Sequence, residues 1–181
     1  MASRLDRFRQ HKDEYFSDGD NSPIDDALLD QFSGLTYFPE HPELEFTLSL
    51  DVSSESSGDL VELETSDGLI AEFRRAGTVS FQVNGENVSL TVLKDMDRGR
   101  FFLPFTDLTS GKVTYGGGRY LDPQADRDGN LIVDFNYSYN PYCAYSDGWS
   151  CPLPPSENAL DVEIPAGEKN YVRPEMIAEE S

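Results

Sequence analysis

The sequence is short of cysteine, histidine and lysine, and each scarcity excludes a class of protein. Two cysteines in 181 residues are too few for the disulfide framework of a small secreted domain, so a reducing compartment is expected. The two histidines, His11 and His41, lie far along the chain from Cys143 and Cys151, whose own separation is longer than that of a zinc knuckle. We therefore predict no metal site.

Long apolar runs are also missing. The first residues, 1–8, carry charge from Arg4 onward and contain no stretch that could form a signal peptide or cross a membrane. We expect a cytoplasmic protein that does not bind membranes.

Positive charge is scarce: 14 basic residues face 34 acidic ones, for a net charge of −20 and an isoelectric point near 4.2. A phosphate-rich partner needs clustered cations, so nucleic acid is excluded as a partner. The acidic residues are spread along the chain and lysine occurs only four times, a composition typical of salt-adapted proteins. We expect a halophilic protein.

What is present favours one domain over residues 1–181, because 38% hydrophobic residues suffice for a core. In the N-terminal region, 1–33, helical periodicity predicts a helix from Ala2 to Phe16. A second short helix is expected over 22–32, where a serine and a proline form a typical helix start. Both helices should pack on a sheet.

From Leu44 the apolar period changes to two, which predicts antiparallel strands throughout 44–136. Asn84-Gly85, between two alternating apolar runs, is the strongest hairpin signal. Further strands are predicted at 100–105, 113–121, 131–135 and 161–164. The fold class is therefore mainly β, an antiparallel barrel or sandwich of about eight or nine strands.

Residues 136–171 are predicted to be an ordered loop rich in Tyr, Cys and Pro followed by a last strand, with 172–181 as a tail, since disordered segments are poor in aromatic residues. The loop could form a pocket for a small polar or anionic molecule, or a cap whose tyrosine hydroxyls are satisfied by the backbone. The candidate ligand-binding residues are Tyr115, Arg119, Asn136, Tyr139 and Asn140.

The glycines of Gly116–Gly118 fit neither a dinucleotide fingerprint nor a phosphate loop. They indicate a bend in the chain or the close approach of another backbone or a ligand. No cofactor is assigned.

Two other functions stay open. Cys143 could be the nucleophile of a hydrolytic or thiol-dependent enzyme, assisted by Asp134, Glu157 or His41. Alternatively, the two cysteines are buried thiols or one bridge in a purely structural or partner-binding protein. The sequence does not decide whether the protein is an enzyme.

Several short motifs in the second half of the chain occur together in one known family. They are Tyr115–Tyr120, Asp134–Asn136, Tyr139–Pro141, Cys143-Ala144, Cys151–Pro155, Glu157-Asn158 and Ala166–Lys169. With them the chain resembles the domain of unknown function 1684, densely over about 101–171 and more weakly back to the first helix. The resemblance implies a shared fold and site region but no activity, and the composition suggests a haloarchaeal-like member.

Overall fold

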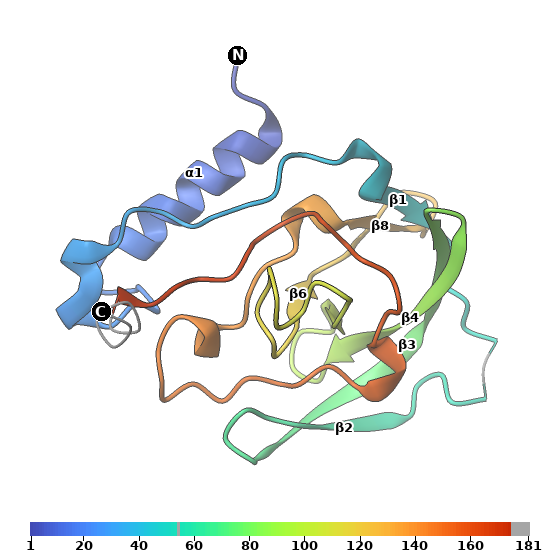
Figure 1. Cartoon of the computed structure of the whole chain (residues 1–181). Coiled ribbons are helices and arrows are strands. Elements are labelled where there is room, and N and C mark those ends of the chain that lie inside the picture. The colour runs from blue at the N-terminus through green and yellow to red at the C-terminus, as the bar shows by residue number, and fades with distance from the viewer. Residues whose placement is uncertain (54, 175–181) are drawn as a thin grey trace.

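A computed structural model describes residues 1–53 and 55–174. Over these residues the fold is mainly β, with eight strands in two antiparallel sheets and the α-helix α1 (Arg4–Ser17) along one side (Figure 1). The five-stranded sheet has the order β2-β3-β4-β5-β6 and the three-stranded sheet the order β1-β8-β7. The bounds of the first sheet are β2 Leu60–Glu64, β3 Ile70–Val83, β4 Glu86–Asp95, β5 Phe101–Phe105 and β6 Arg119–Leu121; those of the second are β1 Glu45–Leu48, β7 Gln124–Ala125 and β8 Leu131–Asp134.

The hairpin of β3 and β4 is the longest element of the fold and curls into a half-barrel (Figure 1). Its turn is Asn84-Gly85, as predicted, with φ of 50° and 84° at the two residues. Two successive left-handed residues match the twist of the strands on either side. Asp51 pairs with Thr78 through two backbone hydrogen bonds of 2.8 and 2.9 Å, which joins the two sheets.

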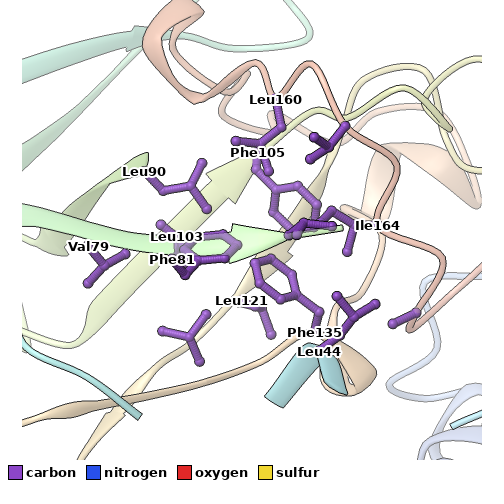
Figure 2. Close-up of a cluster of buried hydrophobic side chains, with 14 of the residues drawn as sticks. Leu44, Val79, Phe81, Leu90, Leu103, Phe105, Leu121, Phe135, Leu160 and Ile164 are labelled. Carbon is purple, nitrogen blue, oxygen red and sulfur yellow. The ribbon is translucent and has the colours of Figure 1, made fainter. Parts of the chain in front are cut away.

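The core lies inside this curve (Figure 2), between the two sheets and the returning chain of residues 160–166. Phe81 of β3 packs on Phe46 of β1 and on Phe135, with ring centroids 4.8 and 5.5 Å apart. Leu160 and Ile164 cover the remaining side. Alternate residues of the strands supply this core, which is why the period-two pattern located the sheet.

The N-terminal region contains α1, whose first turn is capped by reciprocal hydrogen bonds between Ser3 and Asp6. The second predicted helix is different: residues Asp26–Gln31 form a 3-10 helix instead of an α-helix. Such short connectors commonly take the tighter 3-10 form. Four further 3-10 turns are Pro42–Leu44, Phe135–Tyr137, Tyr142–Ala144 and Ser156–Asn158.

One predicted strand is too long, and another is absent. Of 113–121, only Arg119–Leu121 pairs in a sheet. The residues before it form turns, in which the hydroxyl oxygens of Thr109 and Thr114 lie 2.9 Å apart. Residues 161–164 run beside the chain after β5, with a 3.0 Å bond from Leu108 N to Val162 O, but form no strand. In this segment the buried residues Val162 and Ile164 alternate with exposed ones, so burial without strand pairing produces the period-two pattern. Of the predicted tail, 175–181 lie outside the described residues.

Candidate functional site

An open hollow of about 1040 Å³, the aromatic cleft, lies between the five-stranded sheet and the loop of residues 139–152. Seven aromatic residues line it: Phe73 of β3, Phe101 and Phe102 of β5, Tyr120 of β6, and Tyr139, Tyr142 and Trp149 of the loop. The strand alternation explains this arrangement. In β6 the neighbours of Tyr120 are buried and Leu121 belongs to the core, so Tyr120 lies on the opposite face.

The rings of the cleft form two walls, one on the sheet and one on the loop. Phe73 stacks on Phe102 with centroids 5.1 Å apart, and Phe102 meets Tyr120 edge to face at 4.8 Å. Tyr142 and Trp149 form a second edge-to-face pair at 4.9 Å on the loop side. A flat apolar molecule could contact both walls.

The loop is held in place by backbone bonds to the sheet. Ser66 N donates to Cys151 O at 2.8 Å, and Leu153 N donates to Glu64 O at 2.8 Å. Tyr120 and Tyr139 exchange two backbone bonds, and the Tyr120 hydroxyl donates to Pro152 O. The prolines, which lack an amide donor, leave this stretch extended against the edge strand β2.

Three charged residues line the cleft: Asp95, Arg100 and Asp122. The Asp122 carboxylate accepts a 2.8 Å hydrogen bond from the Tyr139 hydroxyl, and its pKa is raised because protein atoms surround it although it still reaches solvent. Arg100 is exposed, and its backbone amide is held by Asp95 at 3.1 Å. Asp95 therefore orders the turn that presents the Arg100 guanidinium.

Arg119, the first predicted ligand contact, is completely buried on the core side of β6 and is not among the residues that line the aromatic cleft. Its guanidinium donates to Ile164 O at 2.8 Å, to Ala166 O, and to Glu168 O at 3.3 Å, and lies 3.5 Å from Asp107 Oδ2. Burial lowers its pKa. Arg119 thus holds the returning chain, residues 164–168.

The other predicted ligand contacts are divided between different places. Tyr139 and Asn140 line the aromatic cleft, and Tyr115 lines a neighbouring hollow. Asn136 is buried, and its side-chain amide bonds to the backbone of His41 as a neighbouring strand would. It accepts from His41 N at 2.8 Å and donates to His41 O at 2.9 Å.

The three groups proposed to assist Cys143 each have another partner. Asp134 Oδ1 accepts from Asn136 N at 3.0 Å, Glu157 pairs with Arg75 at 2.7 Å, and the His41 ring contacts Glu43 at 2.8 Å. No hydrogen bond or ion pair recorded among residues 1–53 and 55–174 joins any of them to Cys143. The structure does not bring these residues together as a catalytic set.

Sequence reasoning missed Phe73, Phe102, Arg100 and Asp122, and did not single out Tyr120. The available signal was the alternation in Arg119-Tyr120-Leu121, which puts the arginine and the tyrosine on opposite faces of one strand. The other four residues come from distant strands and turns, and no short motif marks them.

Within the described chain, no helix is long and apolar enough to span a bilayer. The same residues contain no group of three or more His, Cys, Asp and Glu side chains placed to hold a metal ion.

Fold and site together define a β-rich protein with a half-barrel sheet, a buried arginine, Arg119, that bonds to residues 164–168, and an aromatic cleft. The chain belongs to the DUF1684 family, proteins of unknown function, whose model matches residues 30–169. It is also similar to an uncharacterised protein of Haloarcula marismortui known from a solution NMR structure, with 39% identity over 92% of each chain and a TM-score of 0.65. No curated protein matches the sequence.

Proposed function

We propose that the protein binds a small organic anion with a flat, apolar part in the aromatic cleft. The observation that carries the proposal is the cleft itself: seven aromatic residues from the sheet and the loop line one hollow, with Arg100 at its rim. Ligand pockets combine such apolar walls with a few polar groups that orient the ligand.

The charge of the ligand follows from Arg100, the one basic residue in the lining of the cleft, which also contains Asp95 and Asp122. Arg100 forms no recorded ion pair within the described part of the chain, so its charge is available to an anionic group. Burial raises the pKa of Asp122, and the nearby Arg100 charge opposes this shift, so Arg100 also offsets part of the negative charge at the rim. The net charge of −20 repels anions at long range, but salt screens that repulsion beyond a few ångströms at about 1 M.

The proposed setting is a salt-rich cytoplasm. The acidic composition, the similarity to a Haloarcula protein and the two unbridged cysteines support it.

Trp149 provides a direct test because it is the only tryptophan and lies in the cleft. Titration with anilinonaphthalene sulfonate at about 1 M salt should change the Trp149 fluorescence in a saturable way. Arg100→Gln should weaken binding roughly tenfold, because a charge-assisted hydrogen bond is lost. Arg127→Gln, an exposed arginine in the turn 126–129 and outside the cleft, is the matched control and should leave the affinity unchanged. Equal affinities of the wild type and Arg100→Gln would contradict the assignment of Arg100.

A further inference from the structure

Next to the aromatic cleft is a second hollow of about 620 Å³, the thiol hollow, lined by Ser66, Tyr115, Cys143, Asp147, Trp149 and Arg173 among others. Cys143 faces this hollow, whereas Cys151 lines the aromatic cleft. The two cysteines therefore lie where the two hollows meet.

The cysteines contact each other without a bridge. Cys143 N donates to Cys151 Sγ at 3.4 Å, and the Tyr115 hydroxyl lies 3.5 Å from Cys143 Sγ. Cys143 is half-buried and Cys151 is 7% exposed. Cys143 is thus the more exposed residue of the pair, and it lines the thiol hollow.

Separate parts of the chain hold the two residues. Cys151 N donates to Ser66 Oγ at 3.1 Å, which attaches it to the turn between β2 and β3. The carbonyl of Cys143 accepts a 2.8 Å bond from Arg173. The pair is therefore positioned before any reactant arrives.

The same contacts shift the pKa values of the two thiols in opposite directions. The pKa of Cys143 is lowered to about 6, chiefly by a hydrogen bond from the Cys151 thiol and further by Tyr115 and Ser66, although burial opposes the shift. The pKa of Cys151 is raised by its hydrogen bond to Cys143 and by burial. The other charged groups around the hollow are Arg173, Asp147 and Asp67. Near neutral pH the negative charge lies on the accessible sulfur.

We infer that Cys143 and Cys151 form a dithiol pair that reduces small disulfides. In the first step the Cys143 thiolate attacks one sulfur of the disulfide, the S–S bond breaks, and one thiolate leaves. Cys151 then loses its proton and attacks Cys143 Sγ in the mixed disulfide, which expels the second thiolate. The disulfide is reduced to two thiols, and the protein is oxidised to a Cys143–Cys151 bridge.

The substrate class follows from the size of the thiol hollow, which suits a small molecule. The inference does not rest on the proposed ligand of the aromatic cleft, because the attacking sulfur faces the other hollow. Failure of either proposal would leave the other standing.

The aromatic disulfide of thionitrobenzoate, added to the full-length protein, tests the inference. The wild type should release two thionitrobenzoate ions per chain and retain no adduct, because Cys151 resolves the mixed disulfide. Cys151→Ser should release one and keep the second as an adduct on Cys143. Cys143→Ser should lose the fast phase, because Cys151 is the less exposed thiol and its pKa is raised. A near-ultraviolet circular dichroism spectrum checks that each variant is folded.

The rate gives a second readout that a structural role would not change. At about pH 6.5 a thiol of pKa about 6 is mostly ionised, whereas a free thiol of pKa about 8.5 is ionised to roughly 1%. Lower nucleophilicity removes roughly tenfold of this advantage, so Cys143 should react roughly fivefold faster than a free cysteine. Tyr115→Phe should raise the pH of half-maximal rate.

Either a stable thionitrobenzoate adduct on wild-type Cys143 or a rate no faster than that of free cysteine would overturn the inference. Peptide mapping of the oxidised wild type, which needs no variant, should find the Cys143–Cys151 bridge. Its absence would overturn the inference as well.

Discussion

Arg119 and Tyr120 are adjacent residues with opposite tasks. Arg119 points into the core and satisfies carbonyls of residues 164–168, while Tyr120 forms part of the cleft wall. The cleft therefore depends on a buried arginine that does not line it, because the chain held by Arg119 continues into Glu168 and Lys169, which accept hydrogen bonds of 3.0 and 2.9 Å from Asn140 of the loop.

Arg119→Met is expected to lower the free energy of unfolding by about 3–5 kcal/mol, since it removes the cation that faces the buried Asp107 carboxylate and the guanidinium hydrogen bonds to the carbonyls of Ile164 and Ala166. Arg119→Lys should not restore stability, because one ammonium cannot replace the planar fork. Denaturant unfolding measures both. The exposed control Arg127→Met should change stability by less than about 0.5 kcal/mol. A similarly small effect for Arg119→Met would contradict the anchoring task.

Asp122 should produce a pH-dependent stability difference. Its pKa in the folded protein lies above the value of about 3.9 expected for the unfolded chain, so the folded state holds the proton more tightly. The wild type therefore loses stability as the pH rises through these two values. Asparagine cannot ionise, so the stability of Asp122→Asn relative to that of the wild type should be greater at pH 7 than at about pH 3. Thermal unfolding at both pH values checks this, and an unchanged difference would contradict it.

At the scale of elements, the glycine run before β6 is a packing feature. Gly118 has a φ of +89°, and a Cβ there would lie 2.6 Å from Phe105 O and 2.7 Å from Pro154 Cγ. The backbone of β5 and the proline-rich loop approach each other at this position. Of the two sequence interpretations, the bend with close backbone approach describes Gly118.

Gly118→Ala should therefore destabilise the protein by more than about 2 kcal/mol, through both backbone strain and the clash with Phe105 O. Gly116→Ala is the matched control: its nearest neighbour would be Gly111 Cα at 3.6 Å, and its φ is not left-handed. That variant should stay within about 0.5 kcal/mol of the wild type. Chemical denaturation compares the two, and equal effects would contradict the packing role.

Local signals made some elements predictable and left others beyond reach. The Asn84-Gly85 turn depends on the conformations of two residues, so the sequence identified it correctly. The pairing of residues 160–164 with the chain after β5 depends on distant partners, such as the 2.8 Å bond from Leu160 N to Thr106 O. Alternating apolar residues indicate which residues are buried, but they do not show whether a buried segment is a strand.

The same reasoning applies to the site. The sequence located the loop and two cleft residues, Tyr139 and Asn140, because aromatic and amide groups concentrate there. It could not show that Arg119 is buried, since its carbonyl partners lie more than forty residues away. Phe73 and Phe102 become part of the cleft only through strand pairing.

For the whole molecule, the charge of −20 on a 20.3 kDa chain should make stability depend strongly on salt. Raising salt from about 0.1 M to about 1 M shortens the screening length from about 10 Å to about 3 Å and weakens the mutual repulsion of the carboxylates. The melting temperature should rise continuously over this range. A melting temperature that stays constant or falls would contradict the proposed halophilic character.

Amide chemical-shift mapping with anilinonaphthalene sulfonate tests the aromatic cleft most directly, because it reports where the anion binds as well as whether it binds. The largest shifts should fall on Phe73, Phe102, Tyr120 and Tyr139 and on the Trp149 indole, and should saturate with one binding curve. Saturable shifts confined to another surface, or no saturable shifts in the folded protein, would contradict the proposed site.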